Sequence, residues 1–144
     1  MKFCKVTSTH NQNEINKIIM SMTSVEVDYI ISLYGKISMV EYTDEKGLEC
    51  MFAILDDTLI KKISNLYDKY SIKFEVINLT NDIILDNPFK TKYKNEKGRL
   101  VEKDILKLIK EYKHNWITKD DILDKIIDKG IESLTKFDLS VLKS

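Results

Sequence analysis

The sequence predicts an α+β fold, in which a ferredoxin-like βαββαβ antiparallel sandwich is followed by a C-terminal helical extension. Short apolar segments with strand character recur along the first half of the chain, at 2–8, 37–43, 48–55 and 72–79. Helical periodicity occupies the first and third intervals between them, and a tight turn occupies the second. This order of strand, helix, strand, strand, helix, strand is that of a split βαβ unit.

The first strand, 2–8, is followed by polar residues suited to capping a helix. From Glu14 onward, apolar residues recur every three or four positions, which predicts one continuous helix up to Gly35. We expect Gly35 to end this helix in the left-handed conformation that glycine adopts at low cost. The segment 25–33 also alternates apolar and polar residues, so an extra strand there is an open alternative.

The next elements form a predicted hairpin, a helix and the last strand. The four-residue turn Asp44 to Gly47 joins strands 37–43 and 48–55. Asp56 and Asp57 then begin a helix whose apolar positions lie on one face, and strand 72–79 alternates in the manner of a half-buried strand. Two helices would cover one face of the sheet, leaving the other face open or covered by the C-terminal part.

We divide the chain into an α+β sandwich at 1–84, a linker at 85–100 and a helical extension at 101–144. The linker contains the only proline, Pro88, and is rich in lysine. In the extension, Thr118 and Thr135 each precede an aspartate by three positions, a capping pattern that predicts two short helices after the helix at 101–115. Gly130 would end the first of the two.

The C-terminal hairpin pattern resembles a short module appended to assorted bacterial proteins, some of them rhomboid-like membrane proteins. The resemblance covers about 25 residues of the chain and rests on the following positions: Leu123, Asp124, Lys125, Ile126, Lys129, Gly130, Ile131, Ser133, Leu134, Thr135 and Leu139. Lys136 and Phe137 stand where the module usually has acids. The resemblance implies an appended helical module and no catalytic residue.

Composition indicates a globular protein with no global attraction to polyanions. Of 144 residues, 43% are hydrophobic, and 23 basic residues balance 23 acidic ones. Basic residues are concentrated in 89–113, which we interpret as a solvated face. Cys4 and Cys50 lie in apolar segments, and no apolar run approaches the ~20 residues of a membrane span. We therefore expect a cytoplasmic protein with buried, reduced thiols, and lysine and isoleucine richness suggests a bacterial or phage source.

The motifs of common enzyme classes are absent. The chain has no GxxxxGK[ST], GxGxxG, HExxH or GxSxG pattern. We expect no catalytic residue, no cofactor and no metal. The aromatic and basic pattern of RNA-recognition sheets is also poorly matched, since Phe52 is the lone aromatic of its strand beside acidic Glu49. These patterns disfavour an enzyme and disfavour nucleic acid as a partner.

Two pairs of polar residues are the candidates for ligand binding. His10 and Asn11 follow the first strand, and Asp56 and Asp57 follow the third. Each pair also has a structural interpretation, because Asn and Asp at a helix start accept backbone hydrogen bonds. An enzyme site assembled from His10, Asp56 and Asp57 is a further hypothesis.

The sequence therefore favours a non-enzymatic protein-interaction protein, in the manner of an inhibitor or immunity protein, that binds another protein or itself as a homodimer. A small-molecule-sensing regulatory domain is the first alternative, and a nucleic-acid-binding regulator is the second. The surplus of amphipathic helix in 101–144 favours an interaction surface. Aromatic residues often dominate interfaces, so the candidate contact residues are Tyr93, Tyr112, Trp116 and Phe137.

Overall fold

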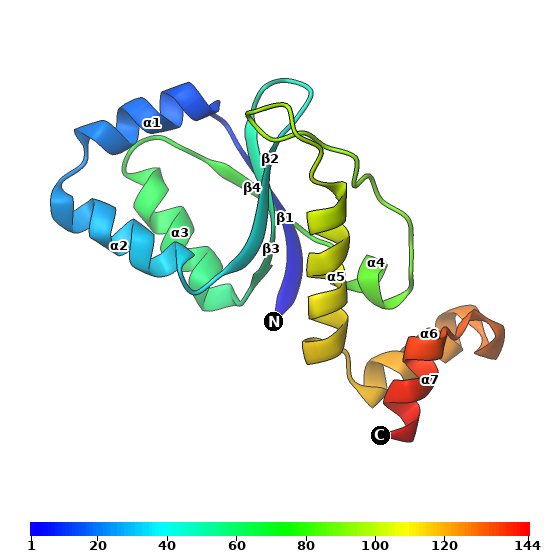
Figure 1. Ribbon diagram of the computed structural model, residues 1–144. Helices are drawn as coiled ribbons and strands as arrows, with labels where there is room; N and C mark the ends of the chain where they lie inside the picture. Colours follow the sequence, from blue (N-terminus) through cyan, green and yellow to red (C-terminus); the bar gives the residue numbers. More distant parts are fainter.

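The computed structural model describes residues 1–144 and shows an α+β architecture with helices on both faces of one sheet (Figure 1). Helices α1 (Gln12–Ser21), α2 (Ser24–Tyr34) and α3 (Asp57–Asp68) cover one face. Helix α5 (Glu102–Trp116) covers the other. The face that could have remained open is thus covered by the C-terminal part of the chain.

The sheet has the strand order β2–β3–β1–β4, and every neighbouring pair is antiparallel. Its strands lie within the four predicted segments: β1 (Lys2–Ser8), β2 (Ser38–Thr43), β3 (Glu49–Leu55) and β4 (Phe74–Asn78). The register pairs Phe3 with Ile54 and Cys4 with Ala53. Because successive side chains of a strand point to opposite faces, Phe3 and Cys4 belong to different helical layers.

The first crossover contains two helices, so the prediction of one continuous helix is wrong. Thr23 begins α2 with a capping box: its hydroxyl accepts the Glu26 N–H at 3.2 Å, and the Glu26 carboxylate accepts the Thr23 N–H at 3.3 Å. These bonds satisfy the free N–H groups of a new helix start. Residues 25–33 lie within α2, which confirms the helix there and excludes the extra strand.

Gly35 does not adopt the predicted left-handed conformation. Its φ of −62° and ψ of −16° are right-handed. The N–H groups of Lys36 and Ile37 donate to Leu33 and Tyr34, so the chain continues in a turn and reaches β2 without a reversal at the glycine.

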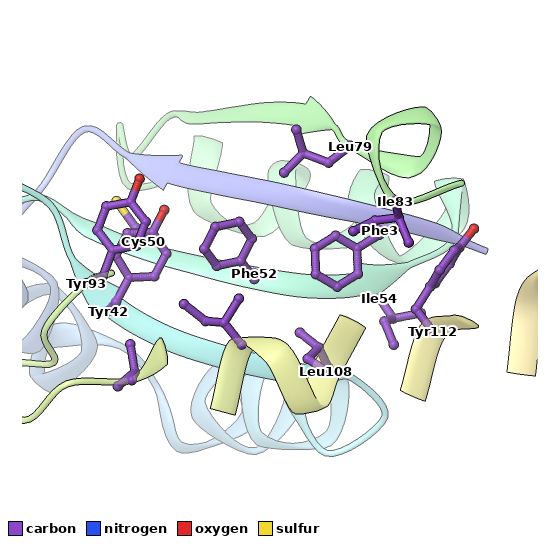
Figure 2. Packing of buried hydrophobic residues seen from close by; sticks show 12 residues of the cluster. Phe3, Tyr42, Cys50, Phe52, Ile54, Leu79, Ile83, Tyr93, Leu108 and Tyr112 are labelled. Atoms are coloured by element: carbon purple, nitrogen blue, oxygen red, sulfur yellow. The ribbon is translucent and has the colours of Figure 1, made fainter. Parts of the chain in front are cut away.

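An aromatic cluster lies between the sheet and α5 (Figure 2). Phe3 and Phe52 are both 0% exposed, with ring centroids 6.0 Å apart. Tyr112 of α5 packs edge-on against Phe3 at 5.9 Å, and its hydroxyl donates to the Met1 carbonyl at 3.1 Å. The sheet aromatics that an RNA-recognition surface would need are therefore covered by α5.

The segment 85–100, predicted as a linker, packs along the edge of the sheet at β2. The Thr43 N–H donates to the Lys94 carbonyl at 2.9 Å, and Tyr93 stacks on Tyr42 with ring centroids 4.1 Å apart. The preceding helix α4 (Thr80–Ile84) was not predicted and buries Ile83. This stretch therefore contributes to the core while containing little regular structure.

The C-terminal hairpin protrudes past the end of α5, away from α1–α3 (Figure 1). It consists of α6 (Lys119–Lys129), the 3₁₀ turn η1 (Ile131–Ser133) and α7 (Lys136–Lys143). Both predicted caps are confirmed, since Thr118 and Thr135 form capping boxes with Asp121 and Asp138. Gly130 ends α6 with a φ of 83°, a conformation that favours glycine.

The two cysteines are free and buried in different layers. Cys4 packs with the α1–α3 layer, whereas Cys50 packs with the aromatic cluster. A disulfide needs its Cβ atoms on a common side of the backbone, so these thiols remain separate in this fold. None of the helices has the length and apolar content needed to cross a bilayer.

Removal of the Tyr42 hydroxyl is expected to be neutral or stabilising. This hydroxyl is buried and has no hydrogen-bond partner, and an unpartnered buried polar group costs about 1–3 kcal/mol. We expect Tyr42→Phe to raise the free energy of unfolding by up to about 1 kcal/mol in urea denaturation. The matched control Tyr112→Phe loses a made hydrogen bond and should lower it by about 1 kcal/mol. A clear destabilisation by Tyr42→Phe would contradict the statement that the Tyr42 hydroxyl has no hydrogen-bond partner.

Candidate functional site

The structure does not bring the four predicted ligand-binding residues together. His10 and Asn11 follow the end of β1, and Asp56 and Asp57 follow the end of β3. Because β1 and β3 are antiparallel neighbours, their C-terminal ends lie at opposite ends of the strand pair, about 20 Å apart at ~3.3 Å per residue. The structure therefore does not assemble one site from His10, Asp56 and Asp57.

Each of these side chains has a local structural partner. Asn11 caps α1 in a capping box with Glu14, and Asp56 caps α3 by accepting the Leu59 N–H at 2.7 Å. Asp57 is exposed and pairs with Lys2 at 2.8 Å. The His10 Nδ1 lies 2.8 Å from the Thr9 hydroxyl. No group of three or more His, Cys, Asp or Glu side chains is placed to hold a metal ion.

The four predicted contact aromatics divide into two kinds. Tyr93 and Tyr112 are only 8% and 3% exposed, and they belong to the aromatic cluster. Trp116 is 44% exposed at the end of α5. Phe137 is half-buried and packs edge-on against His114 at 5.2 Å. Only Trp116 thus presents a large exposed aromatic surface to a partner.

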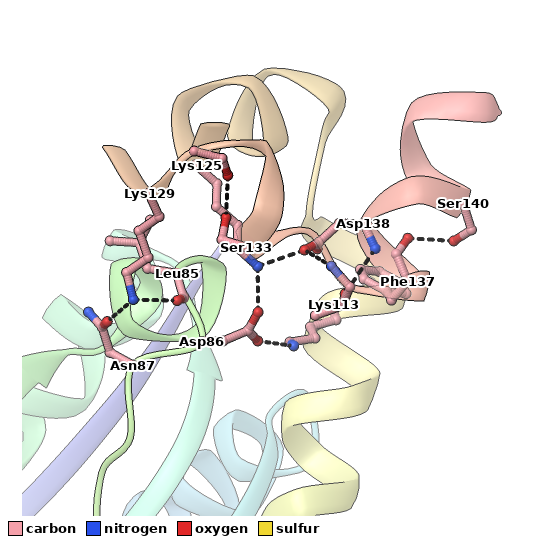
Figure 3. A network of polar contacts seen from close by, with 12 residues as sticks. Leu85, Asp86, Asn87, Lys113, Lys125, Lys129, Ser133, Phe137, Asp138 and Ser140 are labelled. Carbon is pink, nitrogen blue, oxygen red and sulfur yellow. Dashed lines mark hydrogen bonds and ion pairs between the residues drawn. The ribbon is translucent and has the colours of Figure 1, made fainter. Parts of the chain in front are cut away.

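A buried lysine holds the C-terminal hairpin in place (Figure 3). Lys125 of α6 is 0% exposed, and its ammonium group donates to Asp138 of α7 at 2.6 Å and to Asp86 after α4. Lys113 of α5 donates to the other oxygen of Asp86 at 2.7 Å. One network therefore ties α6 to α7, to α5 and to the end of α4.

The electrostatics of this network favour the charged forms. Burial lowers the pKa of Lys125, but the Asp138 and Asp86 carboxylates outweigh that effect and raise it above its ordinary value. Burial raises the pKa of Asp86, but Lys113 and Lys125 outweigh that effect and lower it. The hairpin is therefore held by ionised groups at neutral pH.

The outer side of the hairpin exposes apolar side chains. Leu123 and Ile127 of α6 are 50% and 84% exposed and lie one turn apart on the same helix face. Ile131, at the start of η1, is 70% exposed. A cluster of such residues on one short helical unit is the type of surface that a partner covers.

A hollow of about 460 Å³ lies between α4 and α6, and we call it the α4–α6 groove. Ile84 of α4, Leu85 directly after it and Ile127 of α6 contribute apolar surface to it, and Asp121, Asp124 and Asp128 contribute carboxylates. Two lysines of α6 already have partners: buried Lys125 forms ion pairs with Asp86 and Asp138, and exposed Lys129 donates to the Leu85 carbonyl and the Asn87 side chain. The groove is therefore apolar and acidic.

A second hollow, of about 230 Å³, lies between the sheet and the first three helices, and we call it the inner pocket. Its walls are mainly apolar, and Glu41 of β2 and Glu49 of β3 stand at its polar end. Burial and the nearby Glu41 and Glu96 carboxylates raise the pKa of Glu49 to about 7. Burial also raises the pKa of Glu41, which is the more exposed of the two.

No protein-family model, no curated protein and no solved structure gives a significant match to this chain. Its function is therefore inferred from the geometry and charge of its own surfaces. The burial of Lys125 was not foreseen from the sequence, and neither was the inner pocket. The one local signal for the pocket was the Thr23–Glu26 capping pattern, which separates α1 from α2 above it.

Substitution of Lys125 by methionine is expected to loosen the hairpin. The change leaves the Asp138 carboxylate buried without a counter-ion, which costs about 3–5 kcal/mol. We expect a matching loss of hydrogen-exchange protection in α6 and α7. The double variant Lys125→Met/Asp138→Asn removes the unpaired charge, while the Asn side-chain oxygen can still accept the Thr135 N–H of the capping box, so it should recover most of the loss. Equal protection in the single and double variants would show that the ion pair is not what holds the hairpin.

Substitution of Glu49 by glutamine is expected to stabilise the protein above neutral pH. A raised pKa means that the folded state binds the proton more tightly than the unfolded state. The protein with Glu49 therefore loses stability as pH rises from about 4.5 towards 7. Glu49 is only partly buried, and Lys97 and Arg99 line the adjoining surface, so water and these cations reduce the effect. Allowing for this partial exposure, we expect a gain of about 1 kcal/mol at pH 8 and almost none at pH 4. Urea denaturation across this range measures it, with the exposed Glu75→Gln as control.

Proposed function

We propose that this protein is a non-enzymatic interaction protein of inhibitor or immunity type, and that its C-terminal hairpin binds a basic, amphipathic segment of another protein. The observation that supports the proposal is the α4–α6 groove, where exposed Ile127 lies beside the carboxylates of Asp124 and Asp128. An amphipathic helix laid in a groove is a common mode of peptide recognition. The likeness of the hairpin to appended C-terminal modules agrees with an accessory docking role.

Charge complementarity selects the partner. Asp124 and Asp128 are exposed, lie one turn apart on α6, and form no ion pair within the chain. Lysine or arginine residues spaced by one helical turn would meet both carboxylates, while an aliphatic residue between them would cover Ile127 and Leu123. Such rim charges increase the association rate and orient the partner.

The proposed scaffold for this surface is a ferredoxin-like sandwich. The strand order β2–β3–β1–β4, with antiparallel neighbours and both crossovers on one face, supports this assignment. We place the interaction in the cytoplasm as part of the proposal, because Cys4 and Cys50 are buried as free thiols in separate layers. The scaffold holds the hairpin rigidly through Lys125, so the groove is preformed.

The test uses a helical probe peptide of leucine, alanine and lysine, with its lysines one turn apart, and a matched peptide with glutamate in place of lysine. We expect the basic peptide to bind with a dissociation constant in the micromolar range, and the acidic peptide to bind at least about tenfold more weakly. Isothermal titration calorimetry measures both. The single variant Ile127→Asn removes the apolar contact, and the double variant Asp124→Asn/Asp128→Asn removes the charges. Each should lower the affinity for the basic peptide by about tenfold.

The control variant is Met20→Asn, because Met20 of α1 is 87% exposed and lies far from the groove. It should leave peptide binding unchanged. Equal binding of the two peptides, or equal loss with Met20→Asn, would overturn the proposal. A stable dimer in light scattering that Ile127→Asn dissociates would also overturn it, and would assign the groove to a second copy, whose α5 exposes Leu106 among Lys103, Lys107 and Lys110.

A further inference from the structure

The inner pocket lies on the opposite side of the sheet from the aromatic cluster and is independent of the C-terminal hairpin. Ile15 and Ile19 of α1 and Ile30 and Tyr34 of α2 line it from the helical side, and Met51 of β3 lines it from the sheet. Its volume of about 230 Å³ is below the range of about 300–1,000 Å³ typical of sites for drug-sized ligands. The space therefore suits a small molecule and is too small for a peptide.

Two acidic side chains stand at the polar end of the pocket. Glu41 faces Met51 across the β2–β3 pair, and Glu49 is the next residue of β3 on that face. Neither carboxylate forms an ion pair within the chain. Two neighbouring, partly desolvated carboxylates repel each other, and a bound cation relieves both the repulsion and the desolvation.

The remaining walls favour an organic cation over a hydrated metal ion. Tyr34, Tyr67 and Phe74 place three aromatic side chains around the pocket, and the rings of Tyr67 and Phe74 meet edge-on at 4.9 Å. The Tyr34 hydroxyl donates to that of Tyr67 at 3.2 Å, which fixes both rings. Aromatic walls combined with carboxylates are the chemistry that recognises ammonium groups attached to an apolar body.

We propose that the inner pocket is a binding site for a small amphiphilic amine. The ammonium group of the ligand lies between Glu41 and Glu49, and its apolar body lies among Ile15, Ile30 and Met51. The site belongs to the α1–α3 layer, so it can be occupied whether or not a partner covers the α4–α6 groove.

The experiment compares three probes of nearly equal size: phenethylammonium, neutral 2-phenylethanol and anionic 3-phenylpropionate. Titration at pH 8 followed by ¹H–¹⁵N correlation spectra gives both the affinity and the location. We expect phenethylammonium to bind, with shifts at the amides of Ile15, Ile30 and Met51, and the other two probes to bind at least about tenfold more weakly. Glu49→Gln should lower the affinity for phenethylammonium by about tenfold, as expected for the loss of one charge-assisted hydrogen bond.

The control variant is Glu75→Gln, which changes an exposed carboxylate of β4. Glu75 pairs with Thr7 of β1, and both side chains lie on the face of the sheet opposite the inner pocket. This variant should leave the affinity unchanged. Equal affinity for the cationic and neutral probes, or equal loss with Glu75→Gln, would overturn the proposal. Shifts confined to the backbone amides of Asp121, Asp124 and Asp128 in the α4–α6 groove would overturn it as well, since they would show a general attraction of the cation to exposed acids.

Discussion

The structure depends on the burial of β3 from both sides. Every residue from Cys50 to Leu55 is between 0% and 6% exposed, although antiparallel strands commonly leave one face in water. An apolar strand of this kind must be covered twice, and the chain provides α1–α3 for one face and α5 for the other. Each face of this strand contributes roughly 25 cal/mol per Å² of buried apolar area, and that contribution is lost if the helices covering the face are missing.

The double cover leaves the last two helices without a place on the sheet, and the chain positions them by charge. Lys125 lies 39 positions from Asp86 and 13 from Asp138, and it is buried against both. A buried ion pair adds little net stability relative to apolar packing, but breaking it is costly. Its effect is to favour one orientation of the hairpin, because other orientations would leave the ammonium group or the carboxylates unpaired.

Local patterns were sufficient to predict the strands and the ends of α6 and α7. The apolar run of 48–55, the alternation in 72–79 and the Thr118–Asp121 and Thr135–Asp138 spacings depend on neighbouring residues alone. The break at Thr23 was also encoded locally, by Glu26 three residues later, but the apolar periodicity of 15–33 outweighed it. The burial of Tyr93 and Lys125 could not be predicted, because it depends on partners far away in the chain, such as Tyr42 and Asp86. The inner pocket likewise depends on the register that aligns Glu41 with Met51.

The position of β1 in the middle of the sheet has a consequence for how the chain reaches its native state. Its neighbours β3 and β4 follow only after residue 48, and the Tyr112 hydroxyl that meets the Met1 carbonyl is 111 positions away. During synthesis, Phe3 therefore stays uncovered until α5 has left the ribosome. Long-range pairings of this kind slow folding relative to helical bundles and extend the period in which the nascent chain can aggregate. A chaperone that shields the first strand would shorten that exposure.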